Sequence, residues 1–142
     1  MSKRLTYLDD IKTQLKTIPR FVGVWNQRTL PVRNSFPCIT FYSDNEVMDT
    51  QGLNNQEEIR TLSLNIHCWL QGTLDFEKIE RDMDDCIELV DNCLVKLTDT
   101  MANIKPVSIA FSVTDTEPLL HMVAMIYEVQ YCVDKRNLLT FI

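Results

Sequence analysis

One stretch of the sequence constrains the fold more than any other: within the segment from Glu58 to Leu70, apolar residues occupy every second position from Leu62 to Leu70. Successive side chains of a β-strand point to opposite faces of the sheet, so the alternation predicts a long strand with one buried face. The apolar positions are Leu62, Leu64, Ile66, Cys68 and Leu70, and the positions between them are Thr61, Ser63, Asn65, His67 and Trp69.

Two segments show the spacing of three and four residues that is typical of amphipathic helices. The first has apolar residues at Leu5, Leu8, Ile11, Leu15 and Ile18, and it should end at Pro19. The second begins after Gly72, with Thr73 or Asp75 as the capping residue, and runs for about six turns. Its apolar stripe consists of Phe76, Ile79, Met83, Cys86, Ile87, Val90, Leu94 and Leu97.

Shorter patterns predict the remaining elements. We expect strands at 21–25, 38–43, 107–113 and 122–133, and a long polar loop over 44–57. The resulting order, α-β-β-β-α-β-β, predicts a single two-layer α+β domain over residues 1–142, with a mainly antiparallel sheet and both helices on one face. A polar loop of this length suggests contacts that become ordered by a neighbour, and its candidate residues are Asp44, Glu46, Asp49, Gly52, Asn54 and Asn55.

The residue types needed for catalysis or metal binding do not cluster in the sequence. The three glycines are far apart, which argues against a phosphate-binding loop, and the five cysteines include no Cys-x-x-Cys pair. His67 and Cys68 are adjacent in a strand and therefore should point to opposite faces. We expect no enzyme activity, no cofactor and no metal site. With no signal peptide or membrane span in view, we expect reduced thiols and a cytosolic protein.

Charge is distributed unevenly along the chain. The net charge is −6 and the pI is near 4.8, which argues against nucleic acid as a partner. The second helix carries an acidic stripe of Glu77, Glu80, Asp84, Glu88 and Asp91, whereas the first third of the chain is basic, with Lys12, Lys16, Arg20, Arg28 and Arg33 as candidate contacts. Trp69, on the polar side of its strand, is a further candidate for an interface.

The order of these features resembles the tail terminator proteins of long-tailed bacteriophages, the lambda-like family. The resemblance covers nearly the whole chain. It rests on the amphipathic first helix, the strand at 21–25 with its proline-containing loop, the run from Phe36 to Tyr42 with Glu46 shortly after it, the alternating strand, the acidic helix and two closing strands.

The resemblance implies a ring, thought to be hexameric, at the head-proximal end of the tail tube. Such a ring stops tube polymerisation and contacts the tail tube protein on one side and the head connector or neck proteins on the other. The protein would then be found in the virion, and in the host cytoplasm during assembly. The separate acidic and basic patches suit this arrangement, because a ring built by one repeated contact needs two different complementary surfaces on each subunit.

Two alternatives remain open at the level of the sequence. Another phage neck or head-completion protein would show the same pattern. A small-molecule-binding α+β domain with a pocket between sheet and helices is the competing class, and it would need convergent polar groups inside. The sequence offers none, because both histidines and most acids are expected to face outward.

Overall fold

The structure, a computed structural model, describes residues 3–27, 36–51, 57–72, 75–98, 103–114 and 119–134. Its elements follow the predicted order and confirm the α+β class. They are α1 (Lys3–Lys16), β1 (Val24–Asn26), β2 (Cys38–Gln51), β3 (Glu57–Gln71), α2 (Phe76–Thr98), β4 (Asn103–Val113) and β5 (Leu120–Asp134).

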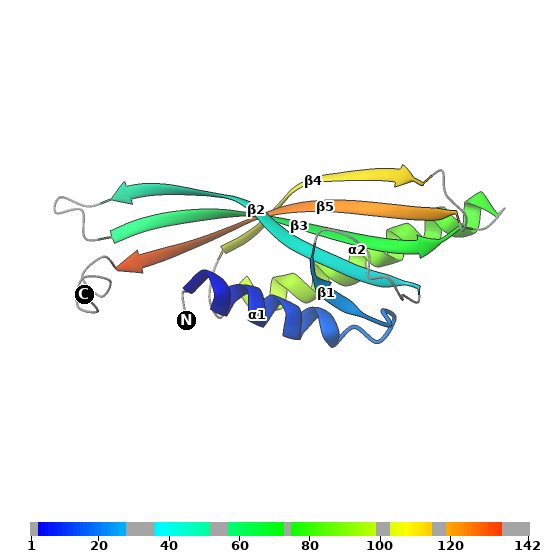
Figure 1. Ribbon diagram of the computed structural model, residues 1–142, viewed down its shortest axis with the longest axis horizontal. Helices are drawn as coiled ribbons and strands as arrows, with labels where there is room; N and C mark the ends of the chain where they lie inside the picture. Colours follow the sequence, from blue (N-terminus) through cyan, green and yellow to red (C-terminus); the bar gives the residue numbers. More distant parts are fainter. Residues whose placement is uncertain are drawn as a thin grey trace.

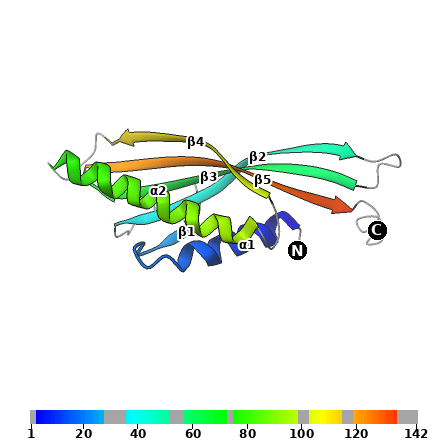
Figure 2. The ribbon, with the colours of Figure 1, turned by 180° about the vertical axis from the view of Figure 1, so that it is seen from behind.

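The described strands form one sheet in the order β1-β2-β3-β5-β4. Only the pairing of β1 with β2 is parallel, and the other neighbours run antiparallel, as predicted. Both helices lie on the same side of this sheet (Figure 1), and the view from behind shows the long α2 crossing beneath it (Figure 2). The molecule therefore has one covered face and one open face.

The core lies between the helices and the covered face. The helix α1 contributes Tyr7, Leu8, Ile11 and Leu15, and α2 contributes a buried stripe that includes Cys86 and Val90. Asp75 caps α2 as expected, because its Oδ1 accepts a hydrogen bond from the backbone N–H of Lys78 at 3.2 Å. Neither described helix is both long and apolar enough to cross a membrane.

The prediction of a polar loop over 44–57 is wrong for 44–51 and for Glu57, and the remaining residues, 52–56, lie outside the described residues. The strand β2 continues to Gln51 and pairs with β3 from Cys38↔Trp69 to Gln51↔Glu57, with Asp44 at a β-bulge. Polar residues occupy this strand because pairing with β3 satisfies their backbone groups whatever their side chains. We now expect slow hydrogen exchange for the amides of β2 that face β3.

Smaller corrections concern the first and fourth strands. Strand β1 starts at Val24 and not at Phe21, which is buried ahead of it. Strand β4 starts at Asn103, earlier than predicted, and includes Pro106. A proline is tolerated there because β4 is an edge strand with a register shift between Pro106 and Ser108.

Candidate assembly surface

Strand β4 is the most exposed element of the described structure. It pairs with β5 on one side, and ten of its eleven side chains are exposed. Ile109, Phe111 and Val113 pair with residues of β5 whose side chains are buried, so they point toward the helix side of the sheet. Their exposed fractions are nevertheless 45%, 60% and 53%. The helices cover the middle of the sheet and leave this edge open.

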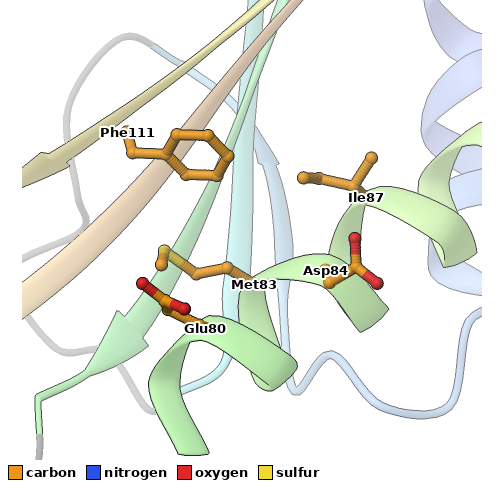
Figure 3. Close-up of a pocket in the computed structure, with 5 residues that line it drawn as sticks. All are labelled: Glu80, Met83, Asp84, Ile87 and Phe111. Atoms are coloured by element: carbon orange, nitrogen blue, oxygen red, sulfur yellow. The ribbon is translucent and has the colours of Figure 1, made fainter. Parts of the chain in front are cut away.

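A groove separates β4 from α2. It has a volume of about 420 Å³ and is lined by Phe111 from the strand and by Glu80, Met83, Asp84 and Ile87 from the helix. Figure 3 shows the apolar side chains facing one another across the groove, with the two carboxylates beside them on α2. The groove thus has an apolar floor and an acidic border.

The acidic stripe of α2 lies mostly at the surface, as predicted. Glu77, Glu80, Asp84 and Glu88 are exposed. Asp91 is different, because it is half-buried and accepts a hydrogen bond from the hydroxyl of Tyr127. Burial is the main cause that raises the pKa of Tyr127, and the carboxylate of Asp91 raises it further. Asp91 therefore stabilises the subunit, and the other four acids are available to a partner.

The basic residues predicted as contacts also include one that is bound within the subunit and others that lie at the surface. Arg20 forms an ion pair with Asp82 at 3.0 Å and lies 4.0 Å from Asp85, both on α2 of the same subunit. Its charge is thus already used to hold the segment that follows α1 against α2. Lys16 is exposed on α1 and Lys12 is half-buried there. Arg28 and Arg33 lie outside the described residues.

The candidates assigned to a loop belong to the hairpin of β2 and β3 or lie outside the described residues. Asp44 is exposed at the bulge, and Asp49 lies farther along β2. Glu46 accepts a hydrogen bond from the hydroxyl of Tyr131 on β5, so it stabilises the sheet. The remaining three, Gly52, Asn54 and Asn55, fall outside the described residues.

Trp69 lies on the open face of the sheet, as predicted, but it is half-buried there. Its Nε1–H donates to Oγ1 of Thr40 at 2.9 Å, and its ring lies 6.2 Å from the ring of His67. His67 also contacts Tyr42, with ring centroids 5.5 Å apart, and burial lowers the pKa of His67. These side chains pack on one another and form a partly shielded patch.

Both histidines are expected to face outward, and the structure corrects this for one of them. His67 lies on the open face beside Trp69, half-buried, whereas His121 is buried on the helix side, where it pairs in register with Leu70. Among the described residues, no group of three or more His, Cys, Asp and Glu side chains could hold a metal ion.

Each of the five cysteines lies in a strand or on the buried side of α2. Four of them are buried and Cys132 is exposed, and all five are free thiols. A hydrogen bond with Cys86, together with burial, raises the pKa of Cys68 well above the ordinary thiol value. At neutral pH Cys68 is therefore a protonated core residue and a poor nucleophile.

A polar network connects β2, β3 and β5 near the end of the sheet where β3 begins and β5 ends. Arg60 Nε donates to Oε1 of the buried Glu58 at 2.7 Å, and Tyr131 donates to Glu46. Tyr131 also contacts Tyr7 of α1 edge to face, with ring centroids 4.9 Å apart. Burial and the carboxylate of Glu46 raise the pKa of Tyr131 to about 12.

This shift predicts a specific loss of stability in alkali. The unfolded chain loses the Tyr131 proton near pH 10, whereas the folded chain keeps it to about pH 12. The contribution of Tyr131 is therefore complete below pH 10 and is lost as the pH rises from 10 to 12. Urea midpoints should fall more steeply over this interval for the parent than for Tyr131→Phe, with Tyr42→Phe as the control. Parallel curves for the parent and Tyr131→Phe would contradict the assignment.

Sequence reasoning missed the apolar part of this surface. Phe111, Met83 and Ile87 were assigned to a strand and to a core stripe, and none was taken as a contact residue. One signal is present: the segment 107–113 contains no charged residue, although it forms the end of an edge strand. No family model matches the sequence, and no curated protein matches it significantly.

Proposed function

We propose that this protein is a structural subunit that assembles with copies of itself into a ring, and that the ring is the tail terminator of a long-tailed bacteriophage. The observation that carries the proposal is the exposed apolar edge formed by β4 and the groove beside it. An apolar edge of this kind is a surface for another protein.

The beginning of the edge carries Lys105, Pro106 and a register shift, which discourage pairing with other chains, but the stretch from Ser108 to Val113 has no such feature. Natural edges are usually short, charged or covered. In β4 the only charged residue is Lys105, and a long uncharged stretch follows Pro106. Its outward backbone groups can receive another strand, and Phe111 offers an aromatic anchor of the type that dominates binding energy at interfaces.

The separation of charge favours a head-to-tail contact. The four exposed acids lie on α2, whereas Lys12 and Lys16 lie on α1. A contact between two different patches generates either a ring or an open filament, depending on whether the rotation closes. The resemblance to tail terminators favours the closed ring, because such a protein stops a tube from growing. A related neck protein would use the same kind of contact.

The test measures assembly and its dependence on the groove. The parent should sediment as a ring at micromolar concentration, and electron microscopy should show it at one end of purified tail tubes. Phe111→Ala should weaken self-association by about thirtyfold, equivalent to ~2 kcal/mol, because it removes the anchor. Val22→Ala is the matched control, since Val22 is also 60% exposed.

Two results would count against the proposal. A parent that stays monomeric, with or without tail tubes, would exclude the terminator ring. Rings that bind connectors but never tubes would instead favour a neck or head-completion protein.

A further inference from the structure

Residues 135–142 have a sequence whose chemistry matches the groove between α2 and β4. We propose that residues 135–142 of one copy dock in the groove of the next copy and join the subunits head to tail. This inference rests on the proposed self-assembly and names the segment that makes the contact.

The chemistry of the segment matches that of the groove. Residues 135–142 read Lys-Arg-Asn-Leu-Leu-Thr-Phe-Ile, two bases followed by a mainly apolar run. The groove offers Met83, Ile87 and Phe111 to apolar side chains, and Glu80 and Asp84 to the bases. Each half of the segment therefore has a counterpart on the surface.

The backbone of β4 can receive this segment as an additional strand. An extended peptide that pairs with a sheet edge gains main-chain hydrogen bonds, and alternate side chains then enter neighbouring pockets. Leu139 and Phe141 are two residues apart and would share one face of such a strand. Ile109 and Phe111 point toward the groove side of β4, so these four side chains would pack together.

The length of the chain requires that the segment come from another copy. Phe111 pairs with Val123, which lies eleven residues before the end of β5 at Asp134. At ~3.3 Å per residue, these eleven residues place the end of β5 about 36 Å from the groove. Phe141 follows Asp134 by seven residues and can move at most about 25 Å from it. Figure 1 shows β5 ending at one end of the molecule and α2 beginning at the other.

Two full-length variants test the contact in trans. The donor variant Leu139→Glu/Phe141→Glu keeps an intact groove, and the groove variant Phe111→Glu keeps an intact segment. Each variant alone should lose self-association by at least about thirtyfold. An equimolar mixture should form one-to-one heterodimers in sedimentation velocity. The intact segment of the groove variant can dock in the intact groove of the donor variant, and no second contact of this kind is possible. Val22→Glu is the matched surface control and should assemble like the parent.

A charge exchange tests the acidic border. Lys135→Glu/Arg136→Glu should weaken assembly at low salt, and the addition of Glu80→Lys/Asp84→Lys should restore it. The difference should vanish in molar salt, where the Debye length is about 3 Å.

The outcomes separate this inference from the proposed function. A donor variant that assembles like the parent, or a mixture that yields no heterodimer, would overturn the docking of residues 135–142 and leave the ring in place. A monomeric parent would overturn both proposals. Heterodimers in the mixture, together with charge rescue, are the result expected.

Discussion

Phe41→Ala is expected to lower the free energy of unfolding by about 3–5 kcal/mol, the usual cost of removing a buried phenylalanine. Phe41 is fully buried near the beginning of β2, where it lies between Asn26 of β1 and Ile66 of β3 in the register of the sheet. Because a domain of this size is stable by only about 5–15 kcal/mol, the variant should unfold at a much lower urea concentration.

The matched control is Phe111→Ala, which removes the same side chain from an exposed position. Its free energy of unfolding should stay within about 0.5 kcal/mol of the parent, measured at a concentration where both are monomeric. Assembly should respond in the opposite order, with a large loss for Phe111→Ala. If Phe111→Ala destabilised the monomer as much as Phe41→Ala, the edge of β4 would be covered by its own chain and could not be the contact surface.

Arg60→Met is the second variant with a large expected effect, a loss of about 3 kcal/mol in the free energy of unfolding. The change removes the guanidinium that faces the carboxylate of Glu58 at 2.7 Å. The Glu58 side chain is only 10% exposed, so water cannot fully replace the lost cation. Urea titration at pH 7 gives the change directly.

A second substitution distinguishes lost electrostatics from lost packing. Glu58→Gln/Arg60→Met should recover more than half of the loss, because the buried charge is then gone as well. If the double variant is as unstable as Arg60→Met, the cost arises from packing of the arginine stem and not from the unmatched carboxylate.

The elements that periodicity predicted well are those whose pattern is decided within the element. The alternation in β3 and β5 and the apolar stripe of α2 each describe one buried face, and a single face can be recognised without its partner. Asp75 could be identified as a cap for the same reason, since capping joins residues only three apart.

The hairpin end of β2 could not be predicted in this way. Residues 44–51 are mostly polar, and they form a strand because β3 offers a complete ladder of backbone partners beside them. The polar side chains of residues 44–51 indicate only that this part of β2 is not buried on both faces. They do not distinguish a strand from a loop. The sequence likewise predicts Glu46, Asp91 and Arg20 as contact residues, whereas in the structure Tyr131, Tyr127 and Asp82 bind them within the subunit.

The sequence by itself determined the α+β class, the order of the elements and which side chains share a face, because these follow from local periodicity. Only the tertiary structure decided which apolar face is covered. Ile109, Phe111 and Val113 show the same alternation as the buried residues of β5, yet they are exposed, and an open groove separates Phe111 from α2. The path of a helix across a sheet depends on contacts among segments distant in the chain, and no local pattern encodes it.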